Sequence, residues 1–281
     1  MPIDLDEYRE KSLDAWNRFA PSWERERDFM VSTTRPVAER LVDRLDPQPG
    51  QTVLDIAAGT GDQGFLVAER VGDGGKLIST DFAPSMVEVA RRVGERAGLG
   101  NVEYRVLNAE RMDLEDDSVD GVLCRFGYML MADPAAALAE TRRVLRQGGR
   151  LSFAVWASPD RNLWAAIPGM TMVELGHLPP PEPGAPSIFA MADPDRVRSL
   201  VTGAGFAEPE TEEVAVRWGY ADADEHWDKT LALAVPIAEA FNSLDQDAQE
   251  KVKATVNERA RERLAEDPGG LDGVVLTVLT S

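Results

Sequence analysis

The sequence has little of several residue types, and each shortage excludes a class of protein. Its 281 residues include one cysteine and two histidines, and no apolar run approaches the roughly 20 residues that span a bilayer. A single cysteine permits no internal disulfide, so Cys124, in the apolar run 121–126, is expected to be a buried structural thiol. No metal site is predicted.

Positive charge is also scarce. There are 30 Lys and Arg residues against 49 Asp and Glu residues, which gives a formal net charge of −19. A phosphate backbone or an anionic membrane would be repelled by most of this surface, so we expect no nucleic-acid partner and no membrane insertion. The acidic N-terminus lacks the basic start and apolar stretch of a signal peptide, which makes a cytoplasmic location the default expectation.

Strand-like and helix-like segments alternate between residues 50 and 156. Strands are expected at 52–57, 76–82, 102–108, 119–127 and 150–156, and helices at 64–71, 84–98 and 133–149. This alternation predicts an α/β fold, a Rossmann-like doubly wound sheet that is mostly parallel. Right-handed crossovers place the carboxyl ends of the strands along one edge, where ligands bind.

The C-terminal third continues with a helix at 193–206, a strand at 210–219 and helices at 226–241 and 246–264. The last segment, 273–281, is an apolar strand that is expected to lie antiparallel beside 210–219 at the sheet edge. The residues between these two strands would then form a helical insertion at about 219–272.

The strongest site signal is the glycine-rich segment VLDIAAGTGDQG (53–64). After Asp55 the residues Ala57, Ala58, Gly59, Thr60 and Gly61 make a tight turn into a helix, and their small size allows close approach of a ligand. Free N–H groups at the helix start attract an anion such as a carboxylate. Asp55 provides the opposite charge for an ammonium, so the turn suits the methionine moiety of S-adenosylmethionine (SAM).

A dinucleotide site is the competing interpretation of this turn. Gly59, Gly61 and Gly64 fit the pattern G-x-G-x-x-G, and Asp81 follows at about the distance of a ribose-binding acid. Two alanines separate the end of the strand from the first glycine, however, and a diphosphate needs no anionic neighbour such as Asp55. The sequence therefore favours SAM over NAD, and both over a turn that only starts a helix.

At these residues the chain resembles the class I SAM-dependent methyltransferases, and most of all the group that includes the ubiquinone/menaquinone-biosynthesis C-methyltransferases. The resemblance covers about residues 15 to 156. Its anchors are LDIAAGTGD (54–62), STDFAPSMVEVA (79–90), NAERMDLEDDSVDGVLCRFG (108–127), LAETRRVLRQGGRLSF (138–153) and the N-terminal RFAPSW (18–23). Ala57 replaces the first glycine of the first motif, a substitution that the group tolerates.

The resemblance implies SAM as cofactor and a role for each matching position. Asp81 would accept hydrogen bonds from both ribose hydroxyls, a task suited to a carboxylate. The other implied SAM contacts are Phe82 and Met86 around the adenine, Asn108, Ala109 and Glu110 at its edge, and Arg125 and Phe126 near the methionine end. Other interpretations stay open: a solvated acid for Asp81, core packing for Phe82 and Met86, a cap for Glu110 and an ion pair for Arg125.

One departure from the group concerns the residues after Phe126 and Gly127. Members that act on quinones carry an Arg-Asn pair shortly after the matching Phe-Gly. Here Tyr128, Met129 and Leu130 follow instead. The quinone-ring chemistry associated with that pair is therefore in doubt for this chain.

Methyl transfer needs mainly positioning and exclusion of water, and it needs a general base only when the nucleophile must lose a proton. The sequence identifies no base. His177, His226 and Tyr128 are weak candidates, because a surface or capping histidine and a packing tyrosine are the simpler interpretations. The predicted function is methylation of O, N or C of a small molecule. The alternatives are an NAD-dependent enzyme and a SAM-binding partner protein without catalysis.

The predicted organisation has four parts. They are an N-terminal helical cap over the cofactor (1–35), a SAM-binding core (36–156), a loop and helix insertion of the substrate cap (157–193), and a C-terminal part of the core with its helical insertion (194–281). Bulky apolar residues are frequent in 1–30, 157–193 and 219–272. If they line the acceptor pocket, the acceptor is apolar or aromatic. The oligomeric state is not predicted.

Overall fold

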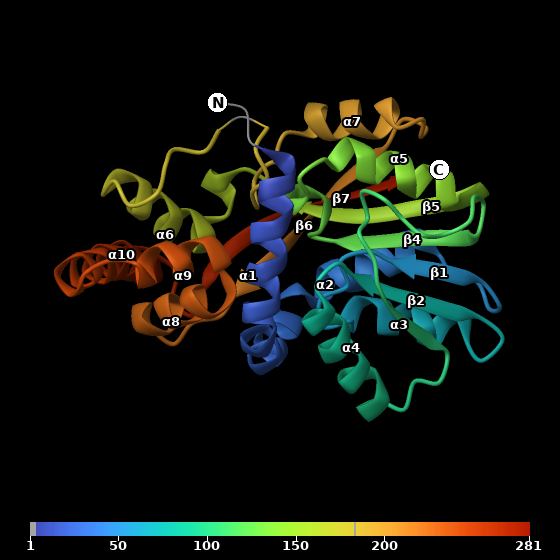
Figure 1. Cartoon of the computed structure of the whole chain (residues 1–281). Helices are drawn as coiled ribbons and strands as arrows, with labels where there is room; N and C mark the ends of the chain where they lie inside the picture. Colours follow the sequence, from blue (N-terminus) through green and yellow to red (C-terminus); the bar gives the residue numbers. More distant parts are fainter. Residues whose placement is uncertain (1–3, 183) are drawn as a thin grey trace.

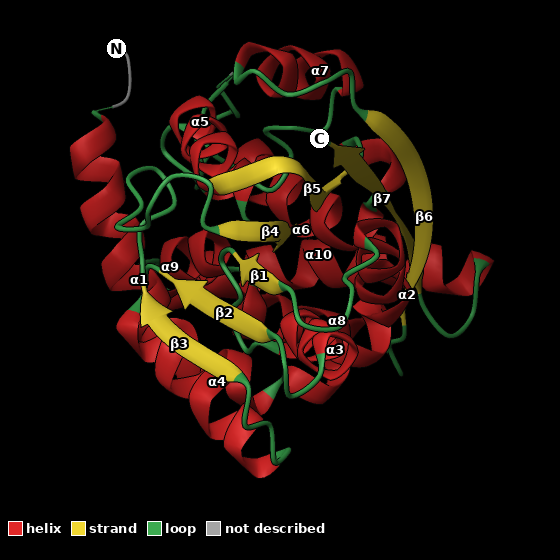
Figure 2. Ribbon diagram, turned by 90° about the vertical axis from the view of Figure 1, so that its right-hand side faces the viewer, coloured by secondary structure: helices red, strands yellow, loops and turns green. Residues whose placement is uncertain are grey.

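The computed structural model describes residues 4–182 and 184–281 of the chain. Its centre is a seven-stranded sheet with the strand order β3-β2-β1-β4-β5-β7-β6 (Figures 1 and 2). The strands are β1 (Thr52–Asp55), β2 (Lys76–Asp81), β3 (Val102–Val106), β4 (Val119–Arg125), β5 (Leu145–Trp156), β6 (Glu210–Trp218) and β7 (Leu271–Thr280). Residues 1–3 of the predicted N-terminal cap and residue 183 of the 157–193 insertion lie outside the described residues.

The sheet confirms the predicted fold class. Strands β1 to β5 pair in parallel, whereas β7 is antiparallel to both β5 and β6. The C-terminal strand therefore pairs with the 210–218 strand, as expected, and lies between it and β5. The strand order reverses between β1 and β4, so the ligand-binding edge is at the carboxyl ends of these two strands.

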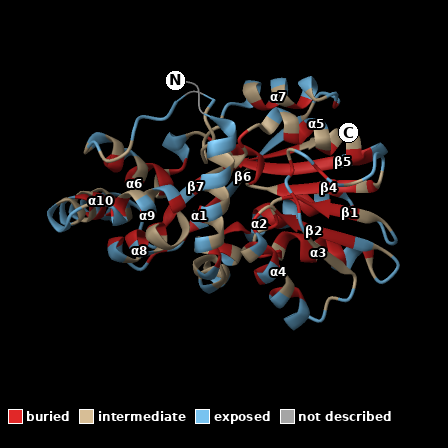
Figure 3. Cartoon of the chain, in the orientation of Figure 1, coloured by how far each residue is buried: buried red, intermediate tan, exposed pale blue. Residues whose placement is uncertain are grey.

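Helices cover both faces of the sheet (Figure 1). The helices α2 (Arg27–Leu45), α3 (Asp62–Val71) and α4 (Pro84–Arg96) lie on one face, and α5 (Pro134–Val144) and α7 (Pro194–Gly203) lie on the other. Figure 3 shows the central strands β1, β2 and β4 mostly buried, as parallel strands are when both faces are covered, whereas most residues of the edge strands β3 and β6 are half-buried or exposed.

A second group of helices lies beyond the carboxyl edge of the sheet, on the left in Figure 1. It comprises α1 (Leu5–Arg25), α6 (Leu163–Glu174), α8 (Ala223–Leu233), α9 (Val235–Asn242) and α10 (Gln246–Glu266). Short 3₁₀ turns at Tyr128–Leu130 and Pro159–Arg161 complete the elements. These helices come from the predicted cap and insertions. No helix in the described ranges is long and apolar enough to cross a membrane.

Three expectations about element boundaries were wrong. The helix predicted at 133–149 ends at Val144, because Leu145 already pairs with Val119 and a bulge shifts the ladder to Gly121 and Arg150. The helix predicted at 226–241 is split into α8 and α9, where Pro236 starts the second helix. The boundary expected after residue 35 falls inside α2, a single helix that packs against β4, β5, β6 and β7.

Candidate functional site

The glycine-rich turn connects the end of β1 at Asp55 to the start of α3 at Asp62. Gly59 and Gly61 have φ angles of 58° and 87°, and a Cβ on Gly61 would lie 2.5 Å from the Phe65 ring. Ala57 also adopts a left-handed φ of 52°, which is strained for a residue with a side chain. This conformation explains why a glycine is the usual residue at the position of Ala57.

Asp55 is fully buried at the base of this turn. Nε2 of Gln63 donates to both of its carboxylate oxygens, at 3.3 and 3.1 Å. A Cβ on Gly64 would lie 2.5 Å from Oδ2 of Asp55, so the carboxylate lies directly against the first turn of α3. Burial raises the pKa of Asp55 to about 8. Arg125 attracts this carboxylate but forms no ion pair with it, and no other cation in residues 4–182 and 184–281 does, so a ligand ammonium would supply the counter-charge.

Asp81 lies at the end of the neighbouring strand β2 and is 8% exposed, so it is buried rather than solvated. Its Oδ2 accepts from the N–H of Gly59 at 3.1 Å, and its Oδ1 accepts from the N–H of Ala83 at 3.0 Å. Burial raises the pKa of Asp81 to about 6, and the backbone hydrogen bonds oppose this rise. The carboxylate is thus fixed against the glycine turn, where a ribose-binding acid is expected.

The predicted adenine contacts lie at the ends of β2 and β3. Phe82 is partly buried, Ala109 is buried and Met86 is 1% exposed within the core. Asn108 is exposed, and its Oδ1 accepts from the N–H of Glu110 at 2.9 Å. The positions of these residues beside Asp81 suit an adenine, and their contact with it stays a prediction.

The carboxylate of Glu110 is held by the N-terminal helix. Nε and Nη2 of Arg9 donate to its Oε2 at 2.9 and 2.5 Å, and the N–H of Ala132 donates to its Oε1 at 2.9 Å. The hydroxyl of Tyr8 donates to the carbonyl of Leu130 at 3.0 Å. Helix α1 is therefore tied to the loops after β3 and β4, and we call residues 5–25 the N-terminal strap. Sequence reasoning did not identify Arg9 or Tyr8, and no motif marks them.

Arg125, the last residue of β4, is held by side chains from two helices. Its Nε and Nη2 donate to Oε1 of Gln63 at 3.2 and 3.1 Å, and its Nη1 donates to Oγ1 of Thr34. Its side-chain hydrogen bonds in the described part of the chain go to neutral groups, and Asp62 and Asp55 attract its charge without a direct ion pair. Its contact with SAM stays a prediction.

Phe126 follows with a left-handed φ of 64°. Its ring stacks on Trp156, with the centroids 4.3 Å apart and the planes at 8°. The next residue has no room for a side chain, since a Cβ on Gly127 would lie 2.7 Å from Cβ of Ala57 and from Sγ of Cys124. A bulky residue held at positive φ at the end of a central strand is typical of a functional site.

Phe126 begins a continuous group of aromatic rings, which we call the aromatic row. The row comprises Phe126, Trp156, Trp164, Trp218, Phe29 and Tyr220. Successive ring centroids lie 4.3, 4.9, 4.1, 5.7 and 5.7 Å apart. Phe29, Trp164 and Tyr220 belong to the segments in which an acceptor pocket was expected, and the row connects those segments to the end of β4. Trp227 instead packs on Phe241 among the cap helices.

The structure separates the three candidate bases. Tyr128 is fully buried, its hydroxyl shares a 2.7 Å hydrogen bond with Thr141, and burial raises its pKa, so it is a packing residue. His177 is partly exposed in the loop after α6. The expectation of a surface or capping role was wrong for His226, which is fully buried. Cys124 is buried as expected, and burial raises the pKa of its thiol to about 12.

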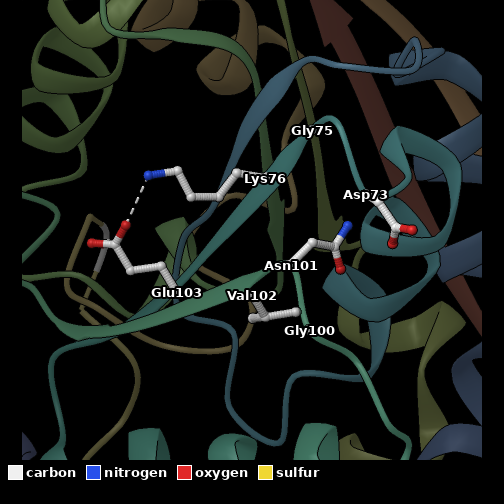
Figure 4. A pocket seen from close by; sticks show the side chains of 7 residues that line it. All are labelled: Asp73, Gly75, Lys76, Gly100, Asn101, Val102 and Glu103. Carbon is white, nitrogen blue, oxygen red and sulfur yellow. Dashed lines mark hydrogen bonds and ion pairs between the residues drawn. The ribbon is translucent and has the colours of Figure 1, made fainter.

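A depression of about 520 Å³ lies at the opposite edge of the sheet (Figure 4). It is lined by Asp73, Gly75, Lys76, Gly100, Asn101, Val102 and Glu103, at the amino ends of β2 and β3. Lys76 and Glu103 form an ion pair of 3.0 Å across it. Because β2 runs from Lys76 to Asp81, this depression is at the other end of the strand from Asp81 and is not part of the candidate site.

Comparison with known proteins gives consistent similarities. The model of the ubiE/COQ5 methyltransferase family matches residues 32–164. The nocamycin O-methyltransferase of Saccharothrix syringae is 32% identical over 214 residues, which are 75% of this chain and 73% of that protein. The demethylmenaquinone methyltransferase of Clavibacter sepedonicus is 31% identical, over 70% of this chain and 81% of that protein. The aklanonic acid methyltransferase of Streptomyces sp. (strain C5) is 33% identical, over 52% of this chain and 65% of that protein.

Solved structures share the fold at low sequence identity. The YcgJ protein of Bacillus subtilis superimposes with a TM-score of 0.57 at 17% identity, covering 86% of this chain and 95% of that one. The [4+2]-cyclase SpnF gives a TM-score of 0.52 at 17% identity, covering 87% and 79%. Since the same fold occurs in a cyclase, the fold alone does not determine the reaction.

Proposed function

Because the chain belongs to the ubiE/COQ5 methyltransferase family and is a SAM-dependent methyltransferase, we propose that it methylates a hydroxyl oxygen of a polycyclic aromatic small molecule. Family membership selects SAM between the two cofactors that the glycine turn allowed. In this proposal the protein acts in the cytoplasm, and its partners include no nucleic acid.

The aromatic row is the observation that carries the proposal. It starts at Phe126, at the carboxyl end of β4, and continues through Trp156, Trp164 and Trp218 to residues of the cap. Phe126, Trp164 and Phe29 are the partly exposed rings of the row, whereas Trp156, Trp218 and Tyr220 are buried. A flat aromatic ligand can pack on the partly exposed rings in offset or edge-to-face contacts, each worth about 0.5–1.5 kcal/mol beyond area burial. A row of this length suits an acceptor with several fused rings.

One relative supports an oxygen acceptor, since its name is nocamycin O-methyltransferase. The aklanonic acid methyltransferase is a second relative named for a small-molecule acceptor, and its name does not state the methylated atom. In contrast, the residues after Gly127 are Tyr128, Met129 and Leu130, so the Arg-Asn pair of the quinone C-methyltransferases is absent at this point. This difference favours O-methylation over methylation of a quinone ring carbon.

The residues of the glycine turn and the strand ends fit SAM. Asp55 would face the ammonium and Asp81 the two ribose hydroxyls. The other proposed contacts are Ala57, Gly59, Thr60, Gly61, Phe82, Met86, Asn108, Ala109, Glu110, Arg125 and Phe126. When bound, the cofactor supplies a methyl group on a sulfonium leaving group. The chain positions the two reactants for in-line transfer, and the N-terminal strap excludes water from the site.

Product analysis tests the proposal. The purified protein is incubated with SAM and a panel of hydroxyanthraquinones, with the matching anthraquinones that lack a hydroxyl as controls. We expect methyl ethers of the hydroxy compounds, identified by mass spectrometry and NMR. Trp164→Leu, which changes a partly exposed ring of the row, should raise KM for these acceptors at least tenfold and leave the Kd for SAM within twofold. Methylation only at ring carbon, or no reaction across the panel, would contradict the proposal.

A further inference from the structure

His226 is held in one tautomer by a single hydrogen bond. It lies in the first turn of α8, fully buried, with Nε2 2.8 Å from the carbonyl oxygen of Trp164. A carbonyl oxygen only accepts hydrogen bonds, so Nε2 must carry the hydrogen. The other ring nitrogen, Nδ1, is then unprotonated and carries a free lone pair.

Nδ1 of His226 is buried and has no hydrogen-bond partner among residues 4–182 and 184–281. A buried polar atom without a partner is unfavourable for the fold. Nine side-chain atoms of the described residues are of this kind, and Nδ1 of His226 is the one imidazole nitrogen among them. A catalytic role is one of the recognised reasons for such an atom. An imidazole with one nitrogen anchored and the other free has the arrangement of a general base.

The position of His226 connects it to the aromatic row. Its ring meets Tyr220 edge-on, with the centroids 5.0 Å apart. Trp164, which anchors Nε2 through its backbone, contributes its own ring to the row between Trp156 and Trp218. The imidazole thus lies directly against the aromatic row along which we propose that the acceptor binds.

Several charged groups on the surrounding elements form ion pairs with one another rather than with His226, while Asp228 on α8 and Asp14 on α1 form no ion pair in the described residues. On α8 itself Lys229 pairs with Glu26 of the N-terminal segment at 2.5 Å, and Asp224 pairs with Lys253 of α10 at 3.1 Å. Remaining pairs on the packed helices are Arg18–Glu239 for α1 and α9, Arg259–Glu174 for α10 and α6, and Arg261–Asp224 for α10 and α8. Glu225 caps the N–H of Ala221 at 2.6 Å. Burial lowers the pKa of His226, so the ring is neutral and able to accept a proton near neutral pH.

We infer that His226 is the general base of the methyl transfer, with Nδ1 accepting the proton of the acceptor hydroxyl. This inference rests on the proposed O-methylation. The acceptor oxygen forms a bond to the methyl carbon while the bond between that carbon and the sulfonium sulfur breaks, and S-adenosylhomocysteine leaves. The hydroxyl proton moves to Nδ1 and is later released to solvent, so charge and atoms balance.

A conservative pair of variants tests this role with 2-hydroxyanthraquinone as the acceptor. His226→Gln can keep an N–H donor toward the carbonyl of Trp164 and removes the basic lone pair. We expect its kcat to fall about 10²–10⁴-fold, the range for loss of a general base, with unchanged Kd for SAM and unchanged melting temperature. Raising the pH should restore its rate in proportion to ionisation of the free phenol. His177→Gln is the matched control and should behave as the wild type.

The pH profile of the unmodified enzyme is a second test that needs no variant. With SAM saturating, we expect kcat/KM for the acceptor to stay level as the pH falls from 8 until it reaches the pKa of His226, below the usual histidine value of about 6.5. A rate that instead follows ionisation of the phenol would overturn the inference, as would a His226→Gln enzyme of wild-type kcat. No methyl ether from the wild-type enzyme would overturn the proposed function and this inference together.

Discussion

Arg125 reaches Asp55 through a single side chain, the amide of Gln63. The amide oxygen of Gln63 accepts from Nε and Nη2 of Arg125, and its amide nitrogen donates to Asp55 and to the carbonyl of Ala58. This relay fixes the orientation of the amide and separates the two charges. The effect of burial on Asp55 therefore outweighs the attraction of Arg125, and its pKa is raised.

The raised pKa of Asp55 predicts opposite effects on stability and binding. Its pKa is about 8 in the folded protein, against 3.8 for an unperturbed aspartate, so its contribution to stability is lost as the pH rises from about 4 to about 8. Above pH 8 the free energy of unfolding of Asp55→Asn should therefore exceed that of the wild type by about 1 kcal/mol. Its melting temperature should be higher by roughly 2–4 °C. The same variant should bind SAM about 10–100-fold more weakly, because a charge-assisted contact to the ammonium is lost. Calorimetry measures both quantities, and a variant that binds SAM normally would refute this role.

Asp81 predicts a pH dependence of SAM affinity. Its pKa is raised to about 6, and only the ionised form can accept hydrogen bonds from both ribose hydroxyls. The association constant for SAM should therefore fall as the pH decreases below about 6, approaching tenfold per pH unit. Asp55 titrates in both the wild type and Asp81→Asn. The ratio of their association constants for SAM at each pH therefore reports the titration of Asp81 alone. A ratio that does not change between pH 5 and pH 7.5 would contradict the assignment.

The left-handed conformation of Ala57 predicts a stabilising substitution. At a φ of 52° a glycine avoids the contact of Cβ with the backbone. We expect Ala57→Gly to raise the free energy of unfolding by up to about 1 kcal/mol and to leave SAM affinity within twofold. Ala57→Val is the contrasting variant and should lower stability, since a branched side chain is more strained there. Thermal unfolding of the wild type and the two variants measures these stabilities. A glycine variant that is less stable than the wild type would show that the turn differs from this description.

The N-terminal strap predicts an effect on the kinetics of SAM release. Arg9 bonds to Glu110, which is also held by the N–H of Ala132. Arg9→Met keeps most of the side-chain volume and removes this ion pair. It should speed SAM dissociation several-fold with little change in association, as most interface changes do. Lys11→Met, which removes an exposed pair with Glu7 on the same helix, is the control. Equal dissociation rates in stopped-flow measurements would mean that the strap does not retain the cofactor.

Local patterns explain which parts of the fold could be predicted. The glycine turn at 53–64 and the alternation of strands and helices are properties of neighbouring residues, so the core and its topology followed from them. The end of α5 could not be predicted, because pairing of Leu145 with Val119 takes those residues from the helix. The split between α8 and α9 was missed although Pro236 was visible.

Long-range contacts explain what was missed in the site. Arg9 meets Glu110 across 101 residues of sequence, and Arg125 meets Gln63 across 62. Neither pairing leaves a local pattern. The burial of His226 depends on packing of α8 against α1, α6 and α10, whereas its sequence surroundings, with Asp222, Asp224 and Glu225 nearby, resemble a surface turn. Asp55, Asp81 and Arg125 are the last residues of β1, β2 and β4, as expected for a site at the carboxyl edge of the sheet.

Calorimetric titration with SAM, S-adenosylhomocysteine and NAD, on the wild type and on Asp81→Ala, tests the central claim most directly. The account predicts micromolar binding of the first two ligands to the wild type, no binding of NAD, and at least tenfold weaker binding of SAM to the variant. Clear binding of NAD without binding of SAM would contradict the account and would indicate that the glycine turn is a dinucleotide site.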